Sequence, residues 1–344
     1  MAETILSNDS TPEEMDLPPA PARKGFLPRL GSIILQQREA SILVVAIVEV
    51  IYFQFASSNF LTGQNIRTIF EFVSATAIIA AGEVMLLICG EIDLSVGQVF
   101  ALAPFIMYFV NQAGLPLWVG IIIGLLVSAM VGLFNGVVTV WFKIPSLIST
   151  LGTQFLLTGI TLTISQGFPV LTPGTGNFNE IMGHGPYSQI VWAVLVMIVV
   201  QIILSFTRWG KHTVATGGNL HGASEAGVNV NRIKIGNFML ASTLAGLAGT
   251  LEAFRITSID PLAGGVTIMF SAVAGAVIGG TALTGGLGTV VGAFLGVLAV
   301  SILNDGFTLL GVSAFTYNII LGVAILIAMI LNVRLRIWRE AGQL

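Results

Sequence analysis

The chain has 344 residues, of which 55% are hydrophobic and only 9% are charged, with a formal net charge of −3. A soluble domain carries charge on about a quarter of its residues, so this composition excludes an ordinary soluble protein. Several uncharged stretches exceed the roughly 18 apolar residues of a spanning helix, and the alternating segments of a transmembrane barrel are missing. The sequence therefore predicts an all-α polytopic membrane protein.

The chain begins with an acidic, proline-rich segment that has neither the basic start nor the apolar core of a secretory signal. We expect residues 1–38 to form a disordered cytoplasmic tail. A transmembrane domain follows at 39–333, and a short cytoplasmic tail at 334–344 ends the chain. The single cysteine, Cys89, excludes an internal disulfide and a cysteine-based metal cluster.

Glycine and polar residues divide the apolar stretches into about ten expected membrane spans. Lysine and arginine precede the first span, follow the last, and gather after the fourth and sixth. With an even number of spans these basic residues fall on one side, so we expect both termini in the cytoplasm. The expected spans are 40–57, 66–88, 94–112, 116–141, 146–166, 188–207, 235–256, 266–283, 288–310 and 314–332.

The first polar motif is G-E-I-D-L-S-V-G at 90–97, which places two carboxyl groups between apolar runs. Charge at membrane depth costs roughly 2.5–3.5 kcal/mol per residue on insertion scales, so these groups need water, a partner or a helix end. Asp93 is predicted to cap the third span, because its carboxylate can accept hydrogen bonds from free backbone N–H groups there. The alternative is a gating or pathway role.

The second motif joins Asn135-Gly136 to K-I-P-S-L-I-S-T-L-G-T at 143–153. Four hydroxyl side chains recur at three- and four-residue spacing, which places them on one helix face. Such a stripe offers donors and acceptors to a polyhydroxylated solute, and small polar residues equally let spanning helices pack closely. The four residues are Ser146, Ser149, Thr150 and Thr153.

The third motif, at 217–235, is polar and glycine-rich although long apolar helices flank it. We interpret it as part of a cytoplasmic segment, 208–235, through which an ATP-hydrolysing partner moves the spans. A fourth motif, at 279–289, is rich in glycine but has Gly286 where a phosphate-binding loop needs lysine. This chain therefore does not bind ATP by that mechanism, and 279–289 is predicted to form a tight turn with close helix contacts.

Charged residues near spans give the main rival interpretation, a stand-alone secondary transporter driven by an ion gradient. Glu252 can pair with Arg255 across one helix turn. A membrane enzyme or scaffold is a third class, but no catalytic constellation and no metal-ligand spacing is present in the sequence. The charged residues concerned are Glu49, Glu71, Glu83, Glu252 and Arg255.

An internal repeat is suggested by Gly124–Gly136 and Gly292–Gly306, each with an asparagine shortly before its last glycine. They fall on the fourth and ninth expected spans, which run in opposite directions. A 5+5 inverted repeat of the kind that builds transport pathways would explain this, and so would chance similarity between two glycine-rich helices.

Taken together, the motifs resemble the permease subunits of bacterial ABC sugar importers, the branch that includes ribose, xylose, rhamnose, fructose and autoinducer-2 systems. They follow the family's order over nearly the whole chain after residue 60, and the ordered set is highly specific although each motif alone is weak. The matching stretches are 90–97, 134–136 with 143–153, 217–219 with 226–228, 278–289 and 303–312.

The resemblance implies an ABC importer permease fold in the bacterial inner membrane. It implies as partners a second permease subunit, identical or related, two ATP-binding subunits and a periplasmic sugar-binding protein, with sugar as substrate and no nucleic acid. The chain itself is expected to bind no cofactor, because ATP and Mg²⁺ would sit on the partner ATPase. The coupling residues are expected to be Gly217, Gly218, Asn219, Ala223, Ser224, Glu225, Ala226 and Gly227.

Leu220-His221-Gly222 departs from the family, which often has an acidic residue and two alanines there. Glycine weakens a helix by roughly 1 kcal/mol relative to alanine, so we expect the coupling helix to begin near Ala223. The expected mechanism is alternating access, with no catalytic residue on this chain. The residues expected to shape the path or its gates are Asp93, Ser95, Asn135, Ser146, Thr150 and Asn304.

Overall fold

The structure is a computed structural model that describes residues 38–174 and 176–313, together with 315, 316, 318–323, 326, 327, 330 and 334. The tail expected at 1–38 lies outside the described residues except for its last residue, and the tail at 334–344 does so except for its first. The span expected at 314–332 is described only in part, because eight of its residues lie outside them.

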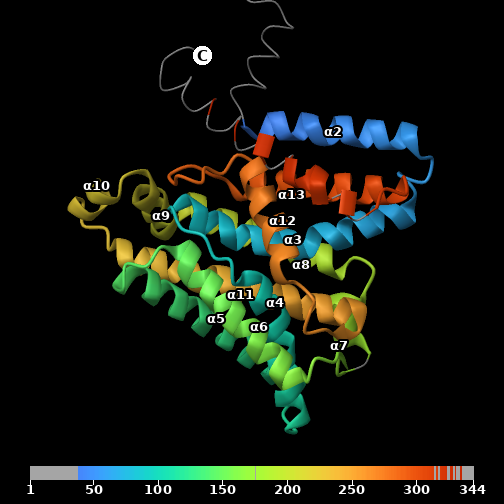
Figure 1. Ribbon diagram of the computed structural model, residues 1–344, viewed down its shortest axis with the longest axis horizontal. Coiled ribbons are helices and arrows are strands. Elements are labelled where there is room, and N and C mark those ends of the chain that lie inside the picture. Colours follow the sequence, from blue (N-terminus) through green and yellow to red (C-terminus); the bar gives the residue numbers. More distant parts are fainter. Residues whose placement is uncertain are drawn as a thin grey trace, which may run out of the picture.

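Helices occupy each expected segment between 40 and 310, with boundaries that differ by a few residues (Figure 1). The elements are α2 (Arg38–Ala56), α3 (Gly63–Ile88), α4 (Val96–Gln112), α5 (Leu117–Trp141), α6 (Ser146–Ser165), β1 (Val170–Leu171), α7 (Asn177–Asn179), the π-helical turn η1 (Glu180–His184), α8 (Ser188–Phe206), α9 (Arg208–Gly218), α10 (Leu220–Glu225), α11 (Val230–Ile256), β2 (Ser258–Ile259), α12 (Gly265–Ile278) and α13 (Val290–Leu309).

In the described part of the chain, six helices are long and apolar enough to cross a membrane, namely α2, α3, α5, α6, α8 and α13. Helices α4 and α12 are also apolar but shorter, with 17 and 14 residues. Helix α11 has 27 residues and carries charged side chains near both of its ends. The chain is therefore a multi-pass helical membrane protein, whereas the total of about ten spans and the inverted repeat stay predictions.

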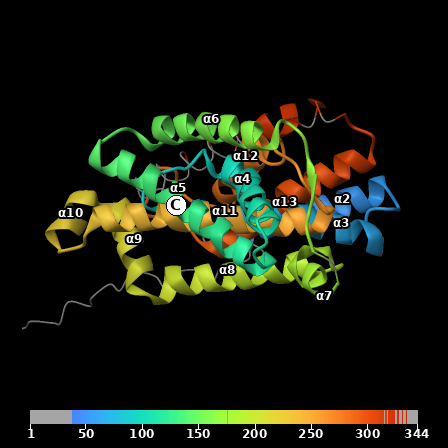
Figure 2. The ribbon, with the colours of Figure 1, turned by 90° about the horizontal axis from the view of Figure 1, so that it is seen from below.

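Helices α3 and α11 lie at the centre of the molecule, and the other long helices surround them (Figures 1 and 2). In the most apolar stretch of α3, 89% of the residues are buried, against 17% in that of α2 and 28% in that of α5. Helix α11 packs against α3, α4 and α5. A Cβ atom at Gly249 of α11 would lie 1.8 Å from the carbonyl oxygen of Phe100 in α4, so glycine permits this backbone contact.

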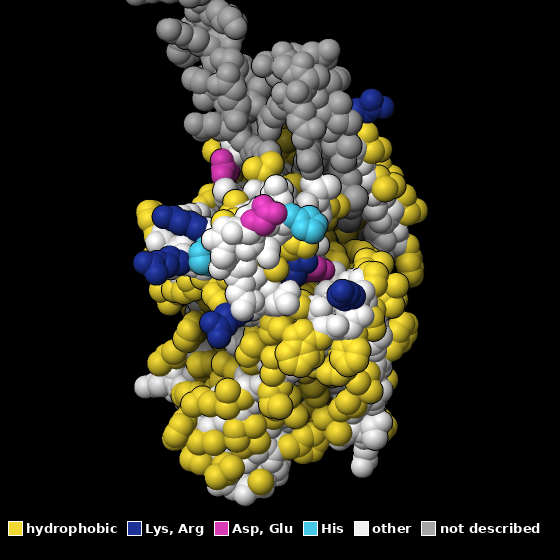
Figure 3. Space-filling view, turned by 90° about the vertical axis from the view of Figure 1, so that its left-hand side faces the viewer, with side chains coloured by type: hydrophobic (Ala, Val, Ile, Leu, Met, Phe, Trp, Pro, Cys, Tyr) yellow, Lys and Arg dark blue, Asp and Glu magenta, His cyan; other side chains and the backbone are white. Residues whose placement is uncertain are grey.

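Helix α11 runs from one end of the molecule to the other. Its 27 residues give it a length of roughly 40 Å. At its N-terminus lie α9 and α10, and Lys and Arg side chains gather on that face (Figure 3). At its C-terminus, β2 pairs in antiparallel register with β1, Ile259 opposite Val170. We call the first the basic end, with Lys143, Arg208, Lys211, Arg232 and Lys234, and the second the far end.

The glycine-rich stretch 279–289 forms a turn between α12 and α13, as its sequence predicts. Gly285 and Gly286 have φ angles of 86° and 79°, in the left-handed region that favours glycine. Helix α12 ends at Ile278, five residues before the expected boundary, because this turn begins directly after it. Helix α11 begins at Val230, earlier than expected, because the Asn229 side chain caps it by accepting a hydrogen bond from the backbone N–H of Arg232.

Candidate functional site

Five of the six side chains expected to shape a path, Asp93 included, lie together in one buried group. The Asp93 side chain is fully buried, and its Oδ1 accepts hydrogen bonds from the backbone N–H and the hydroxyl of Ser95, at 2.9 and 2.6 Å. Asn135 of α5 donates to both carboxyl oxygens at 3.2 Å, and Ser242 of α11 donates to Oδ2 at 3.1 Å. The α3–α4 connection is thereby tied to two long helices.

The prediction that Asp93 caps the third span was wrong. Helix α4 begins at Val96, and the N-cap position is held by Ser95, which makes no capping bond with its side chain. The Asp93 carboxyl group does accept one backbone N–H, that of Ser95, but apart from the Ser95 hydroxyl its other partners come from α5 and α11. Its position is therefore set by tertiary contacts.

The hydroxyl stripe of α6 faces the same connection. Thr150 Oγ1 accepts a hydrogen bond from the backbone N–H of Leu94 at 3.0 Å, and Ser146 Oγ accepts one from that of Ile92 at 3.4 Å. Thr153 donates to Asn135 Oδ1 at 2.6 Å. We name this group the Asp93 cluster: Asp93, Ser95, Asn135, Ser146, Thr150, Thr153 and Ser242.

One member of this cluster, Ser242, and one neighbour, Glu83, were not expected there from the sequence. Ser242 is one hydroxyl within an apolar helix, and its spacing gives no signal of a partner 149 residues earlier in the chain. Glu83 of α3 is fully buried, and its Oε2 lies 3.5 Å from the backbone nitrogen of Asp93. Its other oxygen has no hydrogen-bond partner among the described residues. Within the same residues, no group of His, Cys, Asp and Glu side chains is placed to hold a metal ion.

Asn304, the sixth expected path residue, lies elsewhere, in a cavity of about 340 Å³ toward the far end. Helices α3, α4, α11, α12 and α13 contribute its walls, and the connection between α11 and α12 closes part of it. The lining mixes hydroxyl, amide and charged groups with Phe72 and Phe100. The Asn304 side chain makes no hydrogen bond to another side chain or backbone group of the described residues. We call this space the far-end cavity.

Arg255 is the centre of an ion network at the wall of the far-end cavity. Its Nη2 lies 2.6 Å from Glu252 Oε1 and its Nε 2.9 Å from Glu252 Oε2, which confirms the expected pair across one turn. Its Nη1 donates to Glu71 Oε2 at 3.0 Å, and Arg67 donates to the other oxygen of Glu71 at 2.9 Å. Gln189 of α8 also donates to Glu252, at 2.9 Å. Two arginines thus balance two glutamates.

At the basic end, α10 begins at Leu220, three residues earlier than the expected start near Ala223. The Asn219 side chain accepts a hydrogen bond from the backbone N–H of Gly222 at 2.9 Å and so caps the helix. The predicted coupling residues form one continuous feature: Gly217 and Gly218 end α9, Asn219 is the cap, Ala223, Ser224 and Glu225 lie in α10, and Ala226 and Gly227 follow it. Ala223 is buried, whereas Ser224, Glu225, Ala226 and Gly227 are exposed.

Two contacts join this segment to the helices. A Cβ atom at Gly217 would lie 1.7 Å from the carbonyl oxygen of Ile88 at the end of α3, so the two backbones touch. The same oxygen accepts a hydrogen bond at 2.7 Å from the backbone N–H of Gly286 in the α12–α13 turn. At the start of α11, Lys234 forms a salt bridge with Glu91, two residues before Asp93. The segment is therefore in direct contact with α3 and the α12–α13 turn, and α11, which follows it, is tied to the connection that carries the Asp93 cluster.

Comparison with known proteins adds to this geometry. Residues 65–329 match a family described as branched-chain amino acid transport system / permease component. The chain is 36% identical over 306 residues to the xylose/arabinose import permease protein XylH of Sulfolobus acidocaldarius, covering 87% of this chain and 86% of that protein.

Two further relatives have similar coverage. The ribose import permease protein RbsC of Bacillus subtilis is 34% identical over 312 residues, 90% of this chain and 94% of that protein. The autoinducer 2 import system permease protein LsrC of Salmonella typhi is 31% identical over 306 residues, 88% of each chain. No solved structure matches.

Proposed function

The chain belongs to the branched-chain amino acid transport system / permease component family, and we propose that it is the transmembrane subunit of an ATP-driven importer of a sugar. The observation that carries this proposal is the match over nearly the whole described chain to import permeases of xylose or arabinose, ribose and autoinducer 2. These relatives favour the importer over a stand-alone carrier driven by an ion gradient.

The segment 217–228 is the proposed docking site of an ATP-binding subunit. Its exposed residues stand beyond the helices at the basic end, and its buried Ala223 fixes α10 against them. ATP and Mg²⁺ would be held by the partner, and hydrolysis would take place there. In this arrangement the basic end and both termini face the cytoplasm, and the far end faces the periplasm of a cell with an inner membrane.

Motion of the docked subunit would reach the spans through two contacts. The Gly217–Ile88–Gly286 contact involves backbone atoms without flexible side chains between them, so a push on α9 moves α3 and the α12–α13 turn together. The Lys234–Glu91 salt bridge links α11 to the connection that holds Asp93. Alternating access then follows as a rigid-body movement of helices rather than as bending within one helix.

The far-end cavity is the proposed binding site for the sugar on this chain. Its hydroxyl and amide groups offer donors and acceptors to a polyhydroxylated solute, and Phe72 offers an apolar face for the C–H side of a sugar ring. The second permease subunit would close the open side of the cavity, and a periplasmic sugar-binding protein would deliver the sugar at the far end.

The test is to replace 220–228 by a Gly-Ser linker of equal length and to purify the tagged chain from its host in mild detergent. We expect the native chain to retain an ATP-binding subunit and the variant to lose it while eluting as a folded protein. The matched control replaces residues 166–169, which are exposed at the far end, by Gly-Ser and should keep the partner. Retention of the ATP-binding subunit by the 220–228 variant would refute the docking site.

A second arm tests the importer itself. Proteoliposomes that contain the complete native assembly should accumulate sugar only with ATP and the binding protein present. Uptake that persists without ATP and follows an imposed ion gradient would refute the ATP-driven importer and would support the secondary transporter instead.

A further inference from the structure

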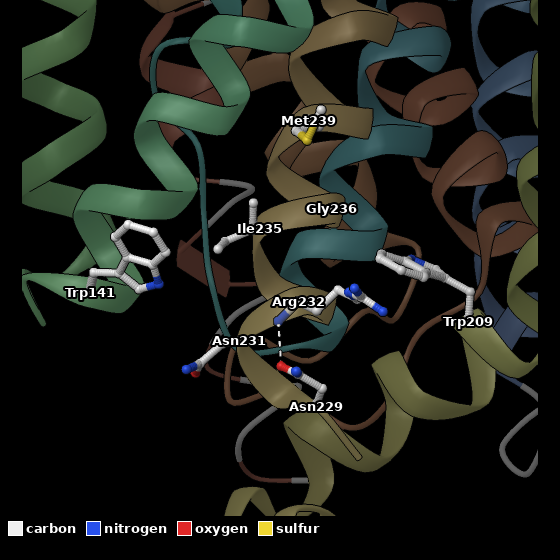
Figure 4. A pocket seen from close by; sticks show the side chains of 8 residues that line it. All are labelled: Trp141, Trp209, Asn229, Asn231, Arg232, Ile235, Gly236 and Met239. Atoms are coloured by element: carbon white, nitrogen blue, oxygen red, sulfur yellow. Dashed lines mark hydrogen bonds between the residues drawn. The ribbon is translucent and has the colours of Figure 1, made fainter.

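A second cavity, of about 470 Å³, lies at the basic end next to the proposed docking residues 217–228, none of which lines it (Figure 4). Its floor is one face of α11, because four of its lining residues recur at the three- and four-residue spacing of a helix stripe. These are Arg232, Ile235, Gly236 and Met239. The stripe starts with a charged residue beside the loop and becomes apolar toward the middle of the helix, so the cavity suits an amphipathic ligand.

Two tryptophans form the walls on either side of this stripe (Figure 4). Trp141 ends α5, one of the helices able to cross a membrane, and is 69% exposed. Trp209 follows α8, another such helix, and its indole N–H donates to Asn237 at 2.8 Å. Tryptophan at the ends of spans marks the level of the lipid headgroups. The cavity therefore lies at the boundary between headgroups and acyl chains.

The wall formed by Trp209 is rigid, because a glycine in α11 lets the indole ring pack closely against the helix backbone. A Cβ atom at Gly236 would lie 2.3 Å from the ring of Trp209, so the indole rests directly on the α11 backbone. Asn237, which holds the indole N–H, is itself fixed by donating to Met85 O and Thr213 Oγ1, each at 3.1 Å. The cavity is thus preformed on this side rather than dependent on a ligand.

The charge of the cavity is positive. Arg232 is exposed and forms no salt bridge within the described chain, unlike its neighbour Lys234, which pairs with Glu91. Asn229 and Asn231 flank it at the polar mouth, and none of the eight lining residues is acidic. A guanidinium group binds phosphate with two parallel N–H donors, and amide side chains add further donors.

We propose that this cavity binds an anionic phospholipid of the surrounding leaflet. The headgroup phosphate lies beside Arg232 and Asn229, and the start of an acyl chain lies along Ile235, Gly236 and Met239 between the indoles. A lipid fits better than a segment of the ATP-binding subunit, because the lining deepens into the membrane level and includes no residue of 217–228. The proposal is independent of which solute the chain transports.

The test is a native mass spectrometry titration of the full chain, purified with its partners and stripped of lipid, with phosphatidylglycerol or phosphatidylcholine of the same acyl chains. We expect preferential binding of phosphatidylglycerol and, for Arg232→Gln, an affinity for it about fivefold lower, the factor for about 1 kcal/mol per basic residue near an anionic surface. Arg232→Lys should keep most of the affinity. The matched control is Arg208→Gln, an exposed arginine at the same end that does not line the cavity, and it should change nothing.

Four outcomes would overturn the proposal. Equal losses in the Arg232 and Arg208 variants would show only general attraction to a basic surface. Equal binding of the two lipids would show that the cavity does not recognise the headgroup charge. Displacement by free glycerol phosphate at millimolar concentration would identify a site for a soluble phosphate, and exclusion of lipid by the docked ATP-binding subunit would assign the cavity to protein.

Discussion

The polar side chains near Asp93 and those near Arg255 lie in the same bundle, yet they are satisfied in opposite ways. Around Asp93 a single carboxyl group accepts hydrogen bonds from neutral donors, and its side chain is 0% exposed. Around Arg255 oppositely charged groups pair, and the arginine and its partner Glu252 remain 27% and 18% exposed beside a cavity.

The difference indicates two kinds of task. A group sealed among three helices and a connection has no room for a solute, so the Asp93 cluster fixes how those parts fit together. A network at a cavity wall can exchange partners with water or a polyhydroxylated solute, because its side chains already contact open space. From the sequence, Asp93 and Asn304 were both expected to shape one path, whereas Arg255 was weighed only for an ion-driven carrier. In the structure Asn304 lies beside Arg255 at the far-end cavity, apart from Asp93.

The largest expected effect is that of Asp93→Ala, which removes the acceptor at the centre of the sealed cluster. The donors of Ser95, Asn135 and Ser242 would stay buried without this partner, and an unsatisfied buried polar group costs about 1–3 kcal/mol. We expect the free energy of unfolding in detergent to fall by about 3 kcal/mol, because several buried donors lose the same acceptor at once. Denaturant titration followed by tryptophan fluorescence would measure it.

The matched control is Asp260→Ala at the far end. Asp260 also accepts a backbone hydrogen bond two residues on, from Leu262 at 2.8 Å, but in an exposed loop. Its loss should cost about 1 kcal/mol or less. If the two variants proved equally stable, the Asp93 cluster would not hold the connection in place.

Arg255→Gln should have a smaller effect on stability and a larger one on transport. Ion pairs that water can reach contribute about 0–1 kcal/mol, so unfolding should change little. Sugar uptake should fall by about tenfold, because the cavity wall loses its cation and Glu252 loses the arginine that pairs with it. Uptake by proteoliposomes of the complete importer would test this.

Arg67→Gln is the control for the Arg255 variant. Arg67 contacts the same glutamate, Glu71, but its side chain is 46% exposed and does not line the far-end cavity. Uptake should stay within about twofold of the native rate, since an exposed pair of this spacing contributes a few tenths of a kcal/mol. Equal losses for both arginines would mean that charge near Glu71, rather than the cavity wall, controls uptake.

The sequence predicts what depends on local interactions. Apolar runs between glycine and polar breaks place the helices to within a few residues, and the pairing of Glu252 with Arg255 follows from helix spacing. Glu71 is the unpredicted third partner because it lies 184 residues from Arg255 in the chain. Likewise, the capping role given to Asp93 considered neighbouring N–H groups only, while Asn135 and Ser242 are 42 and 149 residues away.

The start of α10 shows two local effects of similar size. Gly222 disfavours a helix by roughly 1 kcal/mol, and an asparagine cap favours one by about the same amount. The predicted helix start near Ala223 took only the effect of the glycine into account. In the structure the Asn219 cap sets the start at Leu220. The contact of Gly217 with Ile88 and Gly286 could not be found in this way, because it joins three motifs that are far apart in the chain.

Asn304→Ala gives the smallest effect and the most direct test of the cavity as a binding site for the solute. Since the Asn304 side chain has no hydrogen-bond partner among the described residues, its removal should leave stability unchanged. Loss of one hydrogen bond to a sugar costs about 1 kcal/mol, so the KM of uptake should rise about fivefold at constant kcat. Thr308→Ala, one turn further along α13, removes an exposed hydroxyl that donates to Asn304 O and does not line the cavity, and it should leave KM unchanged. An unaltered KM in the Asn304 variant would mean that the sugar does not bind against Asn304 and would place it elsewhere.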